Sequence, residues 1–202
     1  MFTGIIECMG LVKETQKHSN GNVEFRVQAP FVEELVLGQS IAHNGVCLTV
    51  TAIENGIYNV TAIEETLERT NLGEIKAYEF VNLERCMPAT GRFDGHIVQG
   101  HVDTTGVCEE VISKDGSWIF KFSHESRHEY MTIEKGSICV NGISLTVASS
   151  ENNSFTVAII PFTFEHTNLK SVAKGTKVNL EFDILGKYLC KMTQNLTSHF
   201  DR

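Results

Sequence analysis

The sequence predicts an all-β protein built from two small closed antiparallel barrels, with one α-helix at the C-terminal end. Three observations lead to this fold class. One long segment occurs in two similar copies, each copy holds short β-branched runs between turn signals, and only the tail has a long helical pattern of apolar residues.

The duplication is the strongest of these signals. Residues 40–50, SIAHNGVCLTV, recur as residues 137–147, SICVNGISLTV, a shift of 97 positions from Asn44 to Asn141. The other matched segments are 66–72 with 163–169, 81–84 with 178–181 and, at a shift of 96, 4–10 with 100–106. This period is far too long for a solenoid repeat, so each copy is expected to be a domain with its own core.

Each copy has the pattern of β-structure. Residues 23–27 and 118–122 largely alternate apolar and polar side chains, and residues 47–52 and 155–160 are short runs near Asn-Gly and similar turn signals. Strands at this spacing favour a closed barrel, which leaves no open sheet edge. Two short helices are expected in each copy, at 30–37 and 64–70 in the first and at 125–131 and 162–167 in the second.

The linker and the tail complete the predicted organisation. Residues 88–95, with one Pro and two Gly, mark the boundary, which predicts a first barrel at 1–90, a second at 91–183 and a helix at 184–202. In the tail, apolar residues recur every three or four positions, at Leu185, Tyr188, Leu189, Met192, Leu196 and Phe200. Such a helix is marginal when isolated, so its apolar stripe must pack either on its own barrel or on another protein.

Composition excludes several classes of partner. A net charge of −8 argues against nucleic acid or an anionic membrane as the main partner, because both reward basic patches. No apolar stretch approaches the ~20 residues of a membrane helix, and the N-terminus lacks the features of a signal peptide, so a cytoplasmic location is expected. The six scattered cysteines form no CxxC pair, which argues against a zinc ribbon and, in a reducing compartment, against disulfides.

Differences between the copies indicate unequal chemical roles. The second copy gains a base, a cation and a carboxylate, whereas the first copy carries a thiol where the second has a hydroxyl. The pairs are Ile5 and His101, Gly38 and Lys135, Cys86 and Asp183, and Cys47 and Ser144. Histidine transfers protons near neutral pH, and an ionised thiol is a strong nucleophile.

Other constellations are weaker. On a regular strand, His96 and His101 would face opposite sides, and nothing completes a ligand set, so no metal site is expected. A hydrolase triad could be assembled from Ser144, His101 and Asp183, but the Gly-x-Ser-x-Gly elbow typical of such enzymes is absent. No Walker A or Rossmann glycine pattern occurs.

Five ordered motifs resemble those of the riboflavin synthase α-chain family and together span essentially the whole chain. They are MFTGIIE (1–7), AHNGVCLTV (42–50), ETLERTNLG (65–73), GHIVQGHVD (95–103) and NGISLTV (141–147). The resemblance implies two six-stranded antiparallel Greek-key barrels and a C-terminal helix that gathers three chains into a homotrimer. It also implies a reaction without an external cofactor, in which two molecules of 6,7-dimethyl-8-ribityllumazine exchange a four-carbon unit to give riboflavin and 5-amino-6-ribitylamino-uracil.

The resemblance also implies which residues bind the two substrates. The first pocket would use Gly4, Ile5, Ile6, Cys47, Leu48, Thr49, Thr61, Ala62, Ile63, Glu64, Glu65 and Thr66. The second would use Gly100, His101, Val102, Lys135, Ser144, Leu145, Thr146, Ile160, Pro161, Phe162, Thr163, Phe164 and Glu165. Each active site would lie between the first barrel of one subunit and the second barrel of a neighbour.

Six residues are expected to be catalytic, and Lys135 is expected to assist them. His101 would transfer the proton, with Ser144 and Thr146 as its hydrogen-bonding partners. Cys47 or Ser40 would act as a transient nucleophile or as a polarising group, and the sequence leaves these open. Asp183 would orient a polar group, while Lys135 would stabilise negative charge or anchor the substrate.

The main alternative is a lumazine-binding fluorescent protein, which shares the duplicated barrel but binds its chromophore without turnover. Such proteins generally lack the full set of catalytic side chains, whereas here all of them are present, which favours the enzyme. A generic flavin-binding module would leave the differences at His101, Lys135 and Asp183 unexplained.

Overall fold

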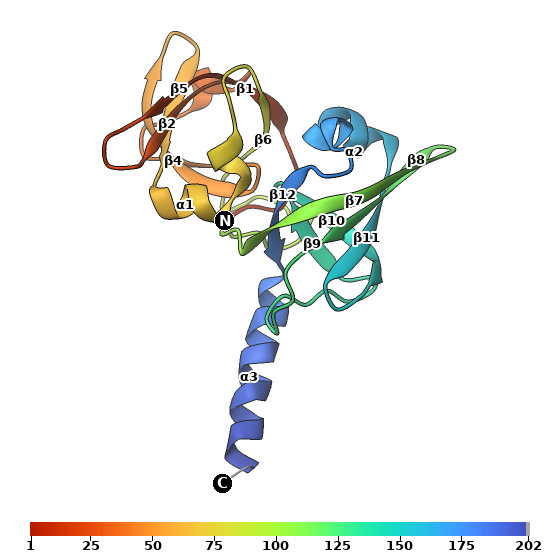
Figure 1. The fold of residues 1–202 in the computed structure, drawn as a ribbon. Helices are drawn as coiled ribbons and strands as arrows, with labels where there is room; N and C mark the ends of the chain where they lie inside the picture. Colours follow the sequence, from red (N-terminus) through yellow and green to blue (C-terminus); the bar gives the residue numbers. More distant parts are fainter. Residues whose placement is uncertain (201–202) are drawn as a thin grey trace.

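The computed structural model describes residues 1–200, with side chains up to residue 194, and consists of two barrels and a helix (Figure 1). Each barrel is closed and antiparallel, with strand order β1-β2-β5-β4-β3-β6 in the first and β7-β8-β11-β10-β9-β12 in the second. This order is a Greek key, and it repeats with every strand number raised by six, as the predicted duplication requires. The strands are β1 (Cys8–Lys17), β2 (Val23–Gln28), β3 (Ser40–His43), β4 (Val46–Glu54), β5 (Ile57–Ala62), β6 (Phe80–Arg85), β7 (Thr104–Lys114), β8 (Ser117–Ser123), β9 (Ser137–Val140), β10 (Ile143–Ser150), β11 (Ser154–Ile159) and β12 (Lys177–Phe182).

The helices follow the predictions in part. Short helices α1 (Glu64–Arg69) and α2 (Pro161–His166) occupy the two predicted segments, and the tail forms α3 (Ile184–Phe200). Each of α1 and α2 is followed by a 3-10 turn, η2 (Asn71–Glu74) or η3 (Asn168–Ser171). The prediction for residues 30–37 was wrong except for one 3-10 turn, η1 (Val32–Glu34), and residues 125–131 form no helix. Phe31, Val32 and Leu35 have helix-like spacing, but they pack individually into the first barrel's core and need no helix to do so.

Each barrel has its own core, and the turns between the central strands follow from local chemistry. Alternate side chains of β4 and β10 point inward, so Leu48 and Leu145 are buried while Thr49 and Thr146 are exposed. The Asn-Gly pairs at 44–45 and 141–142 have positive φ at both residues, the geometry of a type I′ hairpin turn. The predicted turn role of these pairs is therefore confirmed.

An approximate two-fold symmetry relates the barrels, and buried asparagines join them. The Asn82 side-chain amide donates to the backbone oxygen of Asn141 at 2.9 Å, and Asn179 donates to Asn44 at 2.8 Å. All four are 1–2 % exposed, so these bonds satisfy amides that no water reaches. The arrangement fixes one barrel against the other.

A difference between the two cores predicts an acid-sensitive stability. In the first barrel, Nε2 of buried His43 accepts a hydrogen bond from the Tyr58 hydroxyl at 2.8 Å, and Nδ1 donates to Ile41 O. The second barrel has no such pair, because the equivalent residues are Val140 and Phe155. Burial lowers the pKa of His43 from 6.5 to about 4. As the pH falls below 6.5, the histidine is protonated in the unfolded chain but stays neutral in the folded chain. The free energy of unfolding should therefore fall by roughly 3 kcal/mol as the pH drops from 6.5 to 4.

Denaturant unfolding at pH 7 and at pH 5 checks this prediction. His43→Val alone should cost about 1–3 kcal/mol at pH 7, because it leaves the Tyr58 hydroxyl buried without its partner. The double variant His43→Val, Tyr58→Phe copies the second barrel and should lose much of the acid sensitivity. A double variant as acid-sensitive as the wild type would contradict the assignment to His43.

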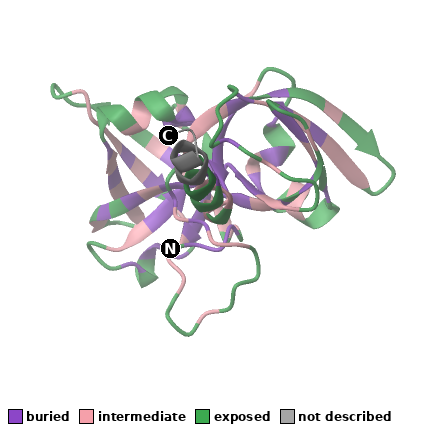
Figure 2. Cartoon of the chain, turned by 90° about the horizontal axis from the view of Figure 1, so that it is seen from below, coloured by how far each residue is buried: buried purple, intermediate pink, exposed green. Residues whose placement is uncertain are grey.

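Helix α3 extends away from the barrels (Figure 1) and is mostly exposed over its described side chains (Figure 2). Its stripe residues Leu185, Tyr188, Leu189 and Met192 are 61–65 % exposed. Leu196 and Phe200 of the predicted stripe lie outside the described side chains. Cys190, on another face, is buried and lies 3.8 Å from His128 O and 3.7 Å from Met131 Sδ of the second barrel. The stripe formed by Leu185, Tyr188, Leu189 and Met192 is therefore not covered by the part of the chain that the structure describes. Within residues 1–200, no helix has the length and apolarity to cross a membrane.

Candidate active site

Five of the predicted site residues lie on the outer faces of the hairpins β3–β4 and β9–β10. Cys47 and Thr49 point outward on β4, and Ser144 and Thr146 occupy the equivalent places on β10. Ser40 pairs with Thr49 across the first hairpin. The twinned polar positions therefore face outward from the two barrels.

The segment before each barrel crosses to the other barrel. Ser144 N–H donates to Gly4 O at 2.8 Å, and Cys47 N–H donates to Gly100 O at 2.9 Å. Ile6 packs against the second barrel's core, and Val102 packs against the first. The structure differs from the predicted grouping in this respect: within the chain, residues 4–6 lie against the second barrel, and residues 100–102 lie against the first.

Two glycines make these crossings possible. Gly4 and Gly100 have φ of +78° and +81°, in the left-handed region. A Cβ added to either would lie 2.6 Å from the Cβ of Ser144 or Cys47. Each crossing segment thus passes against the strand of the other barrel that carries the polar side chains.

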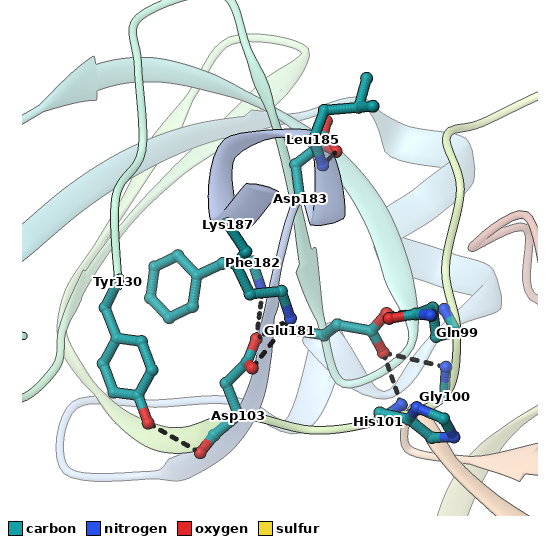
Figure 3. Close-up of polar contacts among 10 residues, drawn as sticks. All are labelled: Gln99, Gly100, His101, Asp103, Tyr130, Glu181, Phe182, Asp183, Leu185 and Lys187. Carbon is teal, nitrogen blue, oxygen red and sulfur yellow. Dashed lines mark hydrogen bonds and ion pairs between the residues drawn. The ribbon is translucent and has the colours of Figure 1, made fainter. Parts of the chain in front are cut away.

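Two buried glutamates hold the crossing segments. Glu84 accepts hydrogen bonds from the backbone N–H groups of Thr3 and Gly4 at 2.6 and 2.9 Å. Glu181 accepts from Gln99, Gly100 and His101 at 2.6, 3.0 and 2.9 Å (Figure 3). Burial raises the pKa of Glu84, and it raises the pKa of Glu181 to about 7 although the backbone donors act in the opposite direction.

In the second-barrel site, the partner of Ser144 is His96 rather than His101. His96 Nδ1 lies 2.6 Å from Ser144 Oγ. Burial lowers the pKa of His96, and the nearby Asp183 carboxylate acts in the opposite direction. A neutral imidazole hydrogen-bonded to a hydroxyl is suited to accept a proton. The expected pairing of His101 with Ser144 was wrong within one chain, because the backbone crossing carries His101 to the Cys47 side.

The sequence contained little signal for His96. At the repeat shift of 96 it has no counterpart in the first copy, so comparing the copies could not single it out. The segment from His96 to His101 is also not a regular strand, contrary to the assumption behind the metal argument. Among the described residues, no group of three or more His, Cys, Asp or Glu side chains is placed to hold a metal ion.

The first-barrel site presents a thiol and an exposed histidine. Cys47 is half-buried, and burial raises the pKa of its thiol although a hydrogen bond with Ser40 acts in the opposite direction. His101 is exposed and directly follows Gly100, whose backbone oxygen accepts the Cys47 N–H, and Glu181 holds the His101 backbone N–H. A raised thiol pKa leaves little thiolate at neutral pH, which favours Cys47 as a polar contact over Cys47 as a nucleophile.

Asp183 and Lys135 also have local structural roles. Asp183 Oδ1 accepts the Leu185 N–H at 3.0 Å at the start of α3, which is a helix-capping contact. Lys135 adopts φ of +66° where the first barrel has Gly38 at +83°. A non-glycine residue in this region is strained, which is consistent with a functional reason for the lysine.

The exposure of each predicted site residue indicates whether a ligand could contact its side chain or only its backbone. The exposed ones are Ile5, Thr49, Ile63, Glu64, Glu65, His101, Lys135, Thr146, Ile160, Pro161, Phe162 and Glu165. The half-buried ones are Ile6, Ser40, Cys47, Thr61, Thr66, Val102, Ser144, Thr163, Phe164 and Asp183. The buried ones are Gly4, Leu48, Ala62, Gly100 and Leu145. The buried side chains offer a ligand only their backbone, whereas exposed apolar groups such as Phe162 (68 %) form a surface suited to a ring or a neighbouring chain.

A pair of variants separates the charge of Lys135 from its backbone strain. Lys135→Gly should raise the free energy of unfolding by about 0.5–1 kcal/mol, because it relieves the positive φ, whereas Lys135→Ala keeps that strain. Both remove the charge, so both should weaken, about tenfold in a fluorescence titration, binding of the lumazine that the sequence resemblance implies as the ligand. Unchanged binding in both variants would remove Lys135 from the site.

The sequence matches the lumazine binding domain family twice, over residues 3–86 and 99–183. It is 45% identical over 189 residues to riboflavin synthase of Actinobacillus pleuropneumoniae, covering 94% of this chain and 88% of that protein. The chain belongs to the riboflavin synthase family. The riboflavin synthase of Bacillus subtilis (strain 168) is 36% identical with the same coverage.

Solved structures agree with this fold. The crystal structure of LumP complexed with riboflavin matches with a TM-score of 0.82 at 21% identity, covering 90% of this chain and 98% of that chain. LumP complexed with 6,7-dimethyl-8-(1'-D-ribityl) lumazine matches with a TM-score of 0.81 at 20% identity. At this identity the likeness concerns the fold alone, whereas riboflavin synthase family members share over a third of the sequence.

Proposed function

We propose that this chain catalyses the riboflavin synthase reaction, in which two molecules of 6,7-dimethyl-8-ribityllumazine give riboflavin and 5-amino-6-ribitylamino-uracil by transfer of a four-carbon unit. The observation that carries this proposal is the pair of equivalent outward-facing sites, built alike but carrying different polar side chains. Donor and acceptor are the same compound, so a duplicated site with unequal groups matches the reaction. The two products together contain all the atoms of the two substrates, so the balance requires no external cofactor.

Each barrel is proposed to bind one lumazine, and the two sites to meet between subunits. Cys47 and Ser144 lie on different barrels of the chain, and Phe162, which is expected to belong to the second pocket, is exposed. The uncovered stripe of α3 supports assembly into a homotrimer, in which the first barrel of one subunit faces the second barrel of another. Holding two reactants together in this way can remove ~7–11 kcal/mol of the barrier. The cytoplasm is the proposed location.

The polar groups then take distinct roles. A proton must leave the 7-methyl group of one lumazine, and His101 is proposed to transfer it, facing the neighbour's second-barrel site. His96 and Ser144, with Thr146 and Asp183 nearby, are proposed to bind and polarise the other lumazine. Cys47 and Ser40 provide hydrogen bonds in the first-barrel site, and Lys135 anchors negative charge.

Incubation with 6,7-dimethyl-8-ribityllumazine as the sole substrate tests this function. Riboflavin formation, followed by absorbance, should consume two molecules of lumazine for each riboflavin formed. Tight lumazine binding without riboflavin would reject the enzyme and favour a non-catalytic fluorescent protein. The 36–45% identity to riboflavin synthases, against 20–21% to LumP, favours turnover.

A further inference from the structure

The base of helix α3 is joined to the second barrel by one ion pair. Lys187 Nζ lies 2.8 Å from both carboxylate oxygens of Asp103 (Figure 3). The two side chains are only 20 % and 17 % exposed, so the pair is less screened than the other ion pairs of the described chain. The pair connects the helix with a residue only two positions after His101.

Asp103 also makes hydrogen bonds to strand β12 on both sides of Glu181, the residue that holds the His101 segment. Its backbone N–H donates to Leu180 O at 2.9 Å, and its Oδ2 accepts from Phe182 N–H at 2.8 Å. These partners are the residues immediately before and after Glu181 on β12. Glu181 in turn accepts hydrogen bonds from the backbone N–H groups of residues 99–101. The chain of contacts therefore runs from α3 through Asp103 and β12 to the backbone of His101.

The first barrel provides an internal comparison. There Glu7 occupies the place of Asp103 and accepts the Arg85 N–H at 2.7 Å, as Asp103 accepts the Phe182 N–H. The cation that pairs with Glu7 is the side chain of Arg85 itself, at 2.7 Å. In the second barrel position 182 is Phe, and the cation comes from α3 instead. Both barrels thus have an acidic side chain that accepts the backbone N–H of the equivalent strand residue. Its cationic partner comes from the strand in the first barrel and from helix α3 in the second.

We propose that Lys187 is a positioning residue that couples the seat of helix α3 to the segment Gln99–His101 of the active site. Because the uncovered stripe of α3 lies on the same helix, contact with neighbouring subunits is transmitted to His101 through this ion pair. The Lys187 charge also favours the ionised form of Glu181, the form that accepts all three backbone donors.

Hydrogen exchange measured by mass spectrometry on the full chain tests this coupling. Lys187→Met should speed exchange in peptides covering residues 97–104 about tenfold or more, because the Glu181 hydrogen bonds open more often. Asp103→Asn, which keeps an acceptor for Phe182 N–H but loses the charge, should do the same. Lys187→Arg should stay close to the wild type. The strand β8 serves as a fold control, and its exchange should not change.

Kinetics supplies a second readout, which rests on the function proposed above. Lys187→Met should lower kcat about tenfold with KM within about threefold, because it disturbs the His101 position more than lumazine binding. Lys121→Met, which breaks the exposed Lys121–Glu151 pair of the same barrel, is the matched control and should leave kcat unchanged.

The two readouts fail in different ways. Unchanged exchange at residues 97–104 in both Lys187→Met and Asp103→Asn would overturn the coupling, whatever the activity. Faster exchange at these residues, with no riboflavin formed even by the wild type, would support the coupling and reject the proposed function.

Discussion

A chain that ends at Asp183 should bind lumazine but form riboflavin at least about 10³-fold more slowly than the full chain, because it can no longer bring the two bound substrates together. Loss of α3 removes the uncovered stripe, and the truncated protein should sediment as a monomer. Fluorescence titration should give a lumazine affinity within about tenfold of the full chain, because each barrel keeps its own site. A fully active monomer would show that the site is not shared between subunits.

The truncation also removes Lys187, so a matched variant is needed. Leu185→Gln, Leu189→Gln and Met192→Gln together make the stripe polar while they keep the helix and the Lys187–Asp103 pair. This variant should also be monomeric and nearly inactive. If it is monomeric but active, the loss in the truncated chain comes from the missing ion pair rather than from assembly.

Two inactive variants should restore each other's activity when mixed. His101→Gln damages the first-barrel site and Ser144→Ala the second-barrel site, and each alone should lower kcat by about 10²-fold or more. In mixed assemblies of the proposed trimer, the first barrel of a Ser144→Ala chain can meet the second barrel of a His101→Gln chain and form an intact site. Random assembly from equal amounts into a closed ring makes about a quarter of the sites intact, so about a quarter of wild-type activity should return.

The control for this experiment uses two variants of the same site. His96 and Ser144 lie 2.6 Å apart on the second-barrel side, so His96→Gln mixed with Ser144→Ala leaves no intact second-barrel site and should restore nothing. Activity is followed after the two chains are unfolded and refolded together. If neither mixture recovers activity, the two substrates are bound by a single chain.

The sequence named the residues that we expect at the site, but it could not predict how those residues are grouped in the folded chain. Gly4 to Ile6 belong with Ser144 because a left-handed glycine lets the segment cross to the other barrel. The repeat shows which positions are equivalent but not which copy's segment crosses to which barrel. His96 was missed for a related reason, since its contact with Ser144 depends on the same crossing.

The helix predictions were also correct in one segment and wrong in another. At 30–37, helix-like spacing of apolar residues reflected separate contacts with the barrel core, so tertiary packing overrode the local pattern. The tail helix was predicted correctly because seventeen residues of consistent period leave little alternative.

The sequence by itself determined the two barrels, their equivalence and their hairpin turns, because strand alternation and Asn-Gly turns are local properties that the chain repeats at a fixed distance. It also determined the tail helix, because helical periodicity is a local property even in a segment that occurs once. Only the tertiary structure decided which crossing segment serves which barrel, that His96 joins Ser144, and that the cation opposite Asp103 comes from α3. Those contacts join residues 48 to 140 positions apart, where a close backbone approach or a buried charge, rather than local propensity, determines the partner.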